Sequence, residues 1–380
     1  MTKREFDIYK IIKNEPLISQ NEIAARLGIT RSAVSSYLVA MIKKGIIKGR
    51  GYIINSDQYP LLVGPGHIDI VSLCSGMSSR PGLYNSKKTT ISYGGAIKNI
   101  AHYLARLEIN PRAIFTASAD FFGSQFLKDC SLNGIDADDS LIMNDISMPI
   151  YNEIATESGE IIASANMEDN LAHRLTPDFL KTKESVFRGA TQIVVHDTLS
   201  YESIEYISSA FNDSTLIYFS IYYNDTVQHM DLLSRFHTII MSYSTALQLT
   251  GGPKEAANAA PNDNEIRHVC TKLQNLGIKN AIILCSLNQT CWMDESNIII
   301  QTTSSESTAD RQGYRFYRDA SVASIIFSMQ RGYTPEESMN HLAASKLIAA
   351  SSSNFIDTNY CQSLVENMSA RLTSTFTNLK

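Results

Sequence analysis

The sequence lacks several features that would assign it at once to a common class of protein. No apolar run approaches the roughly 18 residues of a membrane-spanning helix, and the start, MTKREFDIYK, is charged where a signal peptide would be apolar. The six cysteines form no CxxC pair, and the eight histidines show no metal-ligand spacing. Walker, GxSxG and GxGxxG motifs are absent. We therefore expect a cytoplasmic protein with reduced thiols and no metal site.

The charge of the chain is unevenly divided between its ends. The chain has 380 residues, of which 44% are apolar, so two domains with a sizeable core are expected. Residues 1–50 hold ten Lys and Arg against four Asp and Glu, a balance of +6, whereas the remaining 330 residues carry −11. A basic head on an acidic body indicates that only one end meets a polyanion.

Three helical patterns follow one another in this head. Apolar spacing predicts a helix in REFDIYKIIKN, and the second helix, SQNEIAARLG, opens with a capping box of Ser19 and Glu22. Ala24 is small enough for two helices to cross closely, and Gly28 suits the turn. Val34 lies inward on the third helix, TRSAVSSYLVAMIKKG. This spacing is typical of a helix-turn-helix whose third helix reads the major groove.

The residues that we expect to face DNA are short hydrogen-bonding side chains with a few cations. After the third helix, GIIKGRGYIIN predicts a β-hairpin wing, and the head resembles the winged helix-turn-helix domains of bacterial regulators. A three-helix module that binds protein is the alternative. The predicted contacts to bases and phosphates are Thr30, Arg31, Ser32, Ser35, Ser36, Tyr37, Lys48 and Arg50.

Residues 61–380 alternate between strand-like and helical segments. The boundaries that we expect are 1–55 for the winged helix-turn-helix, 56–60 for a linker and 61–380 for the body. The alternation predicts a doubly wound α/β domain, and shorter β patterns near 68–93 and 147–165 predict a small lid. Ser351–Ser353 and residues 369–380 are expected to be surface chain or frayed helix. The predicted strands are LLVG, AIFTAS, QIVVHD, TLIYFS, TIIMSY and AIILCS.

Three stretches of the body carry a resemblance to a known family. GGAIKNIAHYLARL (94–107), DFFG (120–123) and the block that starts with DASVASIIF (319–327) are similar to motifs of the ribokinase-like (PfkB) carbohydrate and nucleoside kinases. The resemblance covers nearly all of residues 61–355. With the winged helix in front, the chain resembles nucleoside kinases of enteric bacteria that carry such a domain. The resemblance implies ATP and Mg²⁺ as cofactors, provided that the kinase chemistry is intact.

The part of the motif set that holds the sugar is largely present. The resemblance places substrate hydroxyls against Asp69, Gly94, Gly95 and Asn99, and it places His67 where the family has asparagine. Glycines let the backbone approach a ligand, and a carboxylate accepts hydrogen bonds from paired hydroxyls. The alternative is that the glycines only form a strand-to-helix turn and that Asn99 only lies near a helix cap.

The part that holds the nucleotide differs from the family. Residues 316–318, Phe-Tyr-Arg, replace the GAG whose backbone N–H groups hold the transferred phosphate. Residues 242–245, Ser-Tyr-Ser-Thr, replace the NxxE that organises the metal. Leu287 and Thr290 replace glycines of the TxGxxG loop. Arg315 or Arg318 is the one evident substitute for the lost donors.

We therefore expect Asp319, which matches the family's catalytic base, to be an inactive remnant that pairs with an arginine. The sequence predicts a homodimeric, DNA-binding transcription regulator with a ribokinase-like domain that pairs two chains and senses a sugar or nucleoside. Two alternatives stay open. One is an active sugar or nucleoside kinase with an atypical anion hole, and the other is a body without ligand that only pairs two heads.

Overall fold

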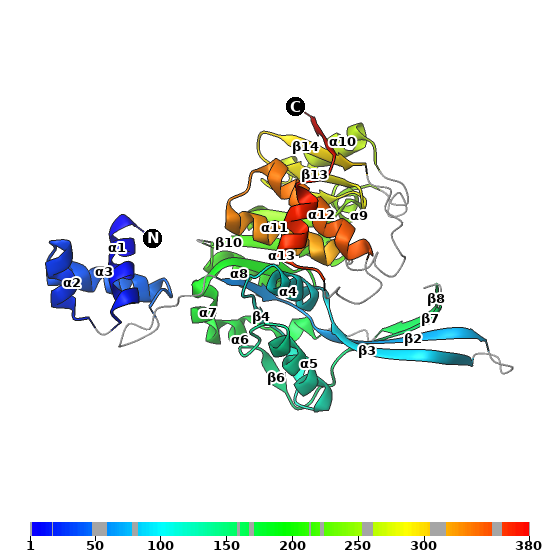
Figure 1. The fold of residues 1–380 in the computed structure, drawn as a ribbon, viewed down its shortest axis with the longest axis horizontal. Coiled ribbons are helices and arrows are strands. Elements are labelled where there is room, and N and C mark those ends of the chain that lie inside the picture. The colour runs from blue at the N-terminus through cyan, green and yellow to red at the C-terminus, as the bar shows by residue number, and fades with distance from the viewer. Residues whose placement is uncertain are drawn as a thin grey trace.

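The computed structural model describes residues 2–16, 18–47, 59–77, 83–157, 160–166, 171–212, 214–220, 224–252, 261–304, 317–351 and 359–379. They form a small helical unit, residues 2–47, and an α/β body that begins at Tyr59 (Figure 1). The predicted wing falls mostly on residues 48–58, so Lys48 and Arg50 lie outside the described residues. Among the described residues, no helix is long and apolar enough to cross a membrane.

The helical unit has the predicted caps. Its helices are α1 (Lys3–Asn14), α2 (Gln20–Leu27) and α3 (Arg31–Lys43). Ser19 and Glu22 form a capping box at the start of α2, which ends at Gly28 with a φ of 62°. The Thr30 side chain accepts a hydrogen bond from the Ala33 N–H at the start of α3. These features set the α2–α3 turn, because a positive φ favours glycine and a capped helix begins at a defined residue.

The three helices enclose a core of their own. Ala24 and Val34 are buried in it, as the helix-turn-helix spacing predicts. Lys44, which follows α3, donates to the nearly buried Glu5 carboxylate of α1 over 2.9 Å. This hydrogen bond is the main cause that lowers the pKa of Glu5. The end of α3 is therefore tied to the start of α1. The core comprises Ile8, Ile12, Ile18, Ile23, Ala24, Val34, Leu38, Met41 and Ile47.

A nine-stranded sheet forms the centre of the body, in the order β15-β14-β13-β12-β11-β10-β9-β1-β4. Six strands pair in parallel: β1 (Tyr59–Val63), β4 (Arg112–Ile114), β9 (Ala190–His196), β10 (Thr215–Ser220), β11 (Thr238–Ser242) and β12 (Ala281–Leu284). Three strands extend one edge in antiparallel fashion: β13 (Gln289–Met293), β14 (Ile298–Thr303) and β15 (Ser374–Asn378). Five of the six strands predicted from the sequence are present as single strands, whereas AIFTAS is split into β4 and a second short strand, β5 (Thr116–Ser118), outside this sheet.

Helices cover both faces of this sheet, which confirms the doubly wound class. On one face, sheet residues such as Val194 and Ile240 pack with α4 (Ala96–Arg106), α5 (Phe121–Leu132), α11 (Tyr317–Arg331), α12 (Pro335–Ser351) and α13 (Gln362–Ser369). On the other face, their neighbours Val195 and Ile239 pack with α6 (Pro177–Thr182), α7 (Glu184–Gly189), α8 (Tyr201–Ala210), α9 (Tyr243–Leu249) and α10 (Asp263–Asn275). Alternate residues of a buried strand thus serve two cores.

The predicted lid is a separate four-stranded sheet that projects from the body (Figure 1). Its strands, in spatial order, are β3 (Tyr84–Gly94), β2 (His67–Met77), β7 (Ile150–Thr156) and β8 (Ile161–Asn166). Two short strands, β5 (Thr116–Ser118) and β6 (Leu141–Met143), pair beside α5. Short 3₁₀ segments cover 172–174 and 224–235.

Two segments differ from the sequence-based expectation. Tyr59 and Pro60, expected to end the linker, are the first residues of β1, and the Tyr59 hydroxyl donates to the Val186 carbonyl. Residues 374–378, expected to be surface chain or frayed helix, form β15, which pairs with β14. Pairing with a partner strand thus overrides the weak local propensity of serine and threonine in this tail.

Candidate functional site

Asp319 lies in the first turn of α11 and is a deeply buried carboxylate of the candidate site. It is 3% exposed, and its Oδ2 accepts a hydrogen bond of 2.9 Å from Asn99 Nδ2 on α4. The structure gives Asp319 Oδ1 and Asn99 Oδ1 no hydrogen-bond partner, although both atoms are buried. Two buried acceptor oxygens without a donor are costly in a finished core. They are therefore suited to a ligand that brings hydroxyl or N–H donors.

Burial raises the pKa of Asp319 to about 7. The hydrogen bond from Asn99 opposes the shift, and so do the nearby His196, Arg318 and His67 side chains. Desolvation prevails because a carboxylate loses more by leaving water than these partners return. At neutral pH the group exists in both protonation states, so it is able to accept a proton from a ligand hydroxyl.

Asp69 and the two glycines build the neighbouring part of the site. Asp69 Oδ1 lies 3.2 Å from His67 Nε2, on strand β2 of the lid. A Cβ at Gly94 would lie 2.1 Å from Asp69 Oδ2, so only glycine fits beside this carboxylate. Gly95 has a φ of 106°, and a Cβ there would lie 2.9 Å from the Pro65 carbonyl oxygen. The strand-to-helix turn and the carboxylate pocket thus require the same two glycines.

His196 and Asp197 are buried at the carboxyl end of β9, and the sequence analysis gave them no role. His196 Nδ1 lies 2.9 Å from Thr198 Oγ1 and 3.0 Å from Asp197 Oδ1. The signal was available, because ligands of α/β proteins bind beyond the carboxyl ends of parallel strands. QIVVHD is such a strand, and it ends in two ionisable residues. Recognising them required the strand order that places β9 inside the parallel part of the sheet, between β10 and β1.

The segment that replaces the metal-organising motif holds hydroxyls in place of a carboxylate. Ser242 Oγ lies 2.8 Å from Ser244 Oγ and 2.9 Å from Thr245 Oγ1, and it accepts a hydrogen bond from the Thr245 N–H. Ser242 thus caps α9. Among the described residues, no group of three or more His, Cys, Asp or Glu side chains is arranged to hold a metal ion.

A buried lysine fixes the turn between β12 and β13. The Lys346 ammonium of α12, 1% exposed, donates to the Ser286 carbonyl over 2.7 Å and to Thr290 Oγ1 over 2.9 Å. It also lies 3.4 Å from the Gln289 carbonyl oxygen, and burial lowers its pKa to about 7. Leu287 lies in this turn and Thr290 in β13, and these are the two positions where the resemblance expects glycine. Lys346 was not predicted from the sequence, because its burial depends on the elements that pack around α12, whose residues from Ser338 to Ala350 are nearly all buried.

Arg318 does not form the expected ion pair with Asp319. Its Nε donates to the Tyr317 hydroxyl over 3.2 Å, whereas Asp319 bonds Asn99. The reason is helical geometry: successive residues point about 100° apart, so Asp319 faces the core while Arg318 is half-buried. Arg315 and Phe316 lie outside the described residues.

The predicted DNA-contacting residues lie on α3 and at its cap. Thr30, Arg31, Ser32 and Ser36 are exposed, and Ser35 is half-buried. Tyr37 is also half-buried and packs against the core of the helical unit, so it is less available than the sequence analysis expected. On the helix wheel Tyr37 lies between the core face and the outward face, which explains this position.

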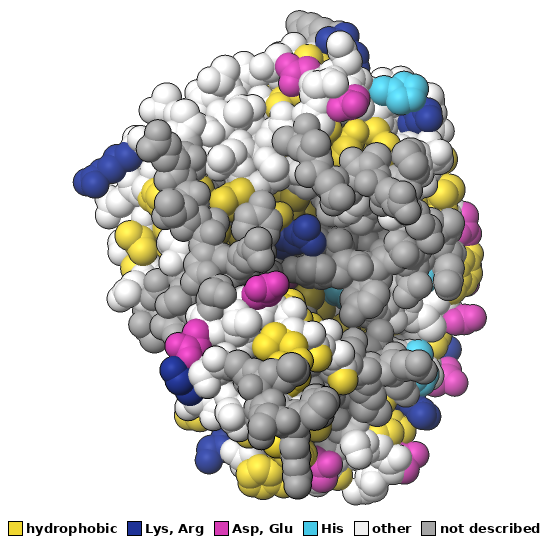
Figure 2. All heavy atoms as spheres, turned by 90° about the vertical axis from the view of Figure 1, so that its right-hand side faces the viewer, with side chains coloured by type: hydrophobic (Ala, Val, Ile, Leu, Met, Phe, Trp, Pro, Cys, Tyr) yellow, Lys and Arg dark blue, Asp and Glu magenta, His cyan; other side chains and the backbone are white. Residues whose placement is uncertain are grey.

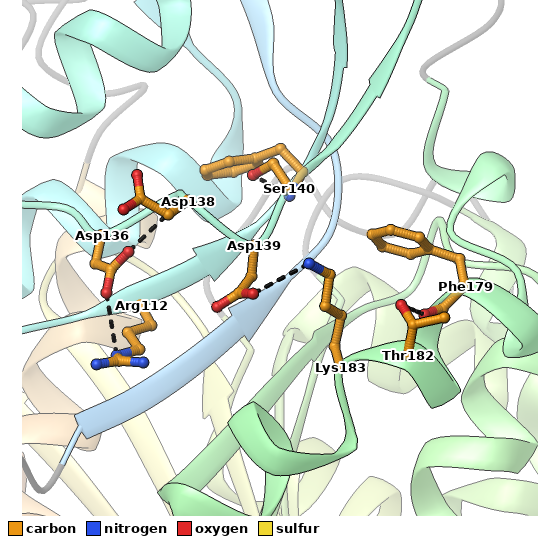
Figure 3. Close-up of polar contacts among 9 residues, drawn as sticks. Arg112, Asp136, Asp138, Asp139, Ser140, Phe179, Thr182 and Lys183 are labelled. Atoms are coloured by element: carbon orange, nitrogen blue, oxygen red, sulfur yellow. Dashed lines mark hydrogen bonds and ion pairs between the residues drawn. The ribbon is translucent and has the colours of Figure 1, made fainter. Parts of the chain in front are cut away.

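A cavity of about 820 Å³ lies far from Asp319, where the end of α3 faces the amino ends of the body strands. Its lining includes Lys43, Arg112, Asp139 and Arg188. Figure 3 shows that the charges here are paired: Arg112 Nε lies 3.2 Å from Asp136, and Lys183 donates to Asp139 over 3.1 Å. Arg112 also stacks on Tyr59. We therefore place the candidate site at the Asp69–Asn99–Asp319 cluster.

The doubly wound sheet, its β lid and the buried carboxylate at the start of α11 define a ribokinase-like domain. The chain belongs to the pfkB family of carbohydrate kinases, whose family model matches residues 62–304. Residues 1–48 match the winged helix-turn-helix DNA-binding model. The PfkB identification and the helix-turn-helix head are thereby confirmed.

Individual relatives support the same architecture. The chain is 25% identical over 357 residues to YeiI of Escherichia coli K12, named an uncharacterized sugar kinase, and the match covers 93% of this chain and 94% of YeiI. Pseudouridine kinase of the same bacterium is 23% identical over 198 residues, 52% of this chain and 63% of that protein.

Solved structures share the fold of the body. A carbohydrate kinase from Agrobacterium tumefaciens superposes with a TM-score of 0.71 at 18% identity, covering 84% of this chain and all of that one. Ribokinase from Thermotoga maritima superposes with a TM-score of 0.67 at 14% identity, and the match covers 82% of this chain and 99% of that one.

Proposed function

We propose that this protein is a DNA-binding transcription regulator whose PfkB domain binds a sugar or nucleoside without phosphorylating it efficiently. The observation that carries the proposal is the contrast between the two ends of the kinase cleft. The ligand end keeps buried oxygens without partners, at Asn99 and Asp319. At the phosphate end, the buried Tyr317 stands where the resemblance expects a small residue, and the buried Lys346 bonds the turn between β12 and β13.

The ligand end suits a polyhydroxylated compound. Asp69, Asn99 and Asp319 offer acceptor oxygens, and His67 is partly exposed beside Asp69. Vicinal hydroxyls of a ribose or hexose bring the donors that these oxygens lack. A bound sugar or nucleoside would satisfy the cluster, and its binding energy would stabilise the domain.

The phosphate end does not fit ATP–Mg²⁺ as the family binds it. Residues 242–245 offer hydroxyls and no carboxylate. The first turn of α11 carries the large side chains of Tyr317 and Arg318, whereas close approach of backbone N–H groups to an anion favours glycine. The turn at 286–290 is held by Lys346. Because phosphoryl transfer depends on positioned charge and metal, this end is not suited to efficient transfer.

A second candidate, an active sugar or nucleoside kinase, is favoured by one specific observation. Asp319 has an oxygen without a partner and a pKa raised to about 7, as a general base for a substrate hydroxyl would need. YeiI, which the chain resembles over nearly its whole length, is named a sugar kinase. In this case Arg315 or Arg318 would take the place of the backbone donors.

Pairing through the lid completes the proposed regulator. One face of the lid sheet exposes Ile91, which pairs with Ile70 of the neighbouring strand. Ribokinase-like proteins commonly pair through lid strands, within 68–93 and 147–165 here. Two chains would present two heads to a pseudo-palindromic DNA site.

The DNA-binding part is tested by titration of the full chain on genomic DNA fragments at several salt concentrations. Affinity should fall with salt by about 0.9 in log–log slope per neutralised phosphate. Arg31→Ala should weaken binding by roughly 1–3 kcal/mol if Arg31 reads a base. Unchanged affinity for the Arg31→Ala, Lys48→Ala double variant would contradict this assignment of the DNA-binding face.

The two candidates are separated by phosphate transfer from ATP–Mg²⁺ to a panel of nucleosides, ribose and hexoses. The regulator predicts no detectable turnover, together with thermal stabilisation of the chain by at least one of these compounds. Asp319→Asn should then leave DNA binding intact. Turnover that disappears in Asp319→Asn would promote the kinase.

A further inference from the structure

The row of α3 side chains that points directly away from the core, the outward line, combines serines with an exposed valine. Val34, Leu38 and Met41 point into the core, and the direction opposite to them is followed by Ser32, Ser36, Val39 and Lys43, all exposed. These four residues are spaced by four, three and four positions, which keeps them on one side of a helix with 3.6 residues per turn. Val39 is 51% exposed in the middle of this line.

The polar side chains on this line are poorly suited to identify a base by themselves. Ser36 Oγ donates to the Ser32 carbonyl over 3.0 Å, and Ser32 Oγ lies 3.0 Å from Thr30 Oγ1. Serine hydroxyls accept or donate toward any base pair, whereas asparagine, glutamine and acidic side chains, which discriminate, are absent from residues 31–43. On the outward line of α3, Val39 is therefore the residue whose chemistry favours one particular base.

The end of α3 lies beside the body. Ile42 and Lys43 line the cavity that the last turn of α3 shares with Arg112 and Arg188 of the body. Val39 lies one turn earlier and does not line this cavity. On the outward line, Val39 is thus the last residue before the helix reaches this cavity.

We propose that Val39 reads a thymine in the major groove through contact of its methyl groups with the C5-methyl group of the base. The major groove displays one apolar group, the thymine methyl, and an exposed aliphatic side chain on a recognition helix is its natural partner. A β-branched residue suits this task because its side chain is stiff in a helix and loses little freedom on contact. The inference rests on the proposed DNA binding and adds the base that the helix selects.

The test uses the full-length chain and uracil, which differs from thymine at this position by the methyl group alone. A pool of random duplexes is first enriched on the wild type, and the preferred sequence is determined. Each thymine of that sequence is then replaced singly by uracil. We expect one replacement per half-site to weaken binding roughly fourfold, the value of about one buried methyl group.

Two variants show whether a lost preference for thymine comes from the Val39 contact or from a change in folding. Val39→Ala should bind the thymine and uracil duplexes equally, while Phe6→Ala, which alters another exposed apolar side chain of the same unit, should keep the fourfold difference. Circular dichroism checks that both variants fold, and Val39→Ser supplies a second readout of the same loss.

The experiment distinguishes failure of thymine recognition by Val39 from failure of DNA binding. If the chain binds no duplex even at low salt, the proposed function fails. If it binds but no thymine-to-uracil replacement matters, or if Val39→Ala keeps the discrimination, Val39 does not read thymine and DNA binding stands.

Discussion

At the scale of single residues, two buried ionisable groups of the body have opposite responses to pH. Burial raises the pKa of Asp319 and lowers that of Lys346, and both reach about 7. Asp319 bonds Asn99, and Lys346 bonds the turn at 286–290. The charged form of each is disfavoured by desolvation, so each group opposes folding in the pH range where it is charged.

Asp319→Asn should stabilise the body at alkaline pH. The folded pKa of Asp319 is raised from 3.8 to about 7, so its contribution to stability is present below pH 3.8 and is lost as the pH rises through 7. Asparagine still accepts from Asn99 and does not ionise. We expect the variant's advantage in unfolding free energy to grow between pH 4 and 7, to at most about 4 kcal/mol.

The measurement is urea unfolding followed by the fluorescence of Trp292, the single tryptophan, which lies in β13 of the body. Asp178→Asn is the matched control, because the Asp178 side chain is 94% exposed. If the difference in unfolding free energy between Asp319→Asn and the wild type does not change with pH, Asp319 is not desolvated in the folded protein.

Lys346→Met should show the opposite pH dependence. The folded pKa of Lys346 is lowered from 10.5 to about 7, so the wild type gains stability as the pH rises from 7 toward 10.5. The variant lacks this gain and leaves the Ser286 carbonyl without its donor. Between pH 7 and 9.5 the wild type should gain up to about 3 kcal/mol relative to Lys346→Met. The same urea titrations test this, and Lys181→Met is the control because Lys181 is exposed. If the unfolding free energies of the wild type and Lys346→Met depend on pH in the same way, the prediction is wrong.

At the scale of helices and strands, the sequence predicted what local chemistry controls. Ser19, Gly28 and Thr30 mark helix ends through their own backbone and side-chain hydrogen bonds, so these ends were readable. β15 was missed because STFTN becomes a strand only by pairing with β14, which is distant in the chain. His196 and Lys346 were missed for the same reason: their burial depends on which elements the fold brings together.

Gly28→Ala should destabilise the helix-turn-helix and leave the body unchanged. Gly28 has a φ of 62° and no atom within 4 Å of an added Cβ, so the cost is backbone strain alone, about 1–2 kcal/mol. Gly332→Ala is the matched control, because it is equally open at a φ of 69° but lies in the body after α11. Far-UV circular dichroism reports both units, and Trp292 fluorescence reports the body. A shift of the Trp292 transition in Gly28→Ala would contradict independent units.

At the scale of the whole molecule, the head and the body differ in the sign of their net charge. The head carries +6 and the rest of the chain −11. On the face of the body seen in Figure 2, the described acidic and basic side chains are interspersed and form no large patch of one sign. A duplex is therefore attracted to the head, and the body contributes by setting how many heads meet the same DNA.

Dimerisation is the whole-molecule property on which tight DNA binding should depend. Ile91, 55% exposed on the lid, is a large apolar residue on the surface proposed for pairing. Ile91→Asp places a charge in that surface and should shift the chain from dimer to monomer in analytical ultracentrifugation. Because a second linked head raises the effective concentration at its half-site, the variant should lose at least about tenfold in DNA affinity. Leu132→Asp is the matched control, since Leu132 is 77% exposed at the end of α5, away from the lid. A wild-type monomer that still binds DNA tightly, or an Ile91→Asp variant that stays dimeric, would exclude the lid as the pairing surface.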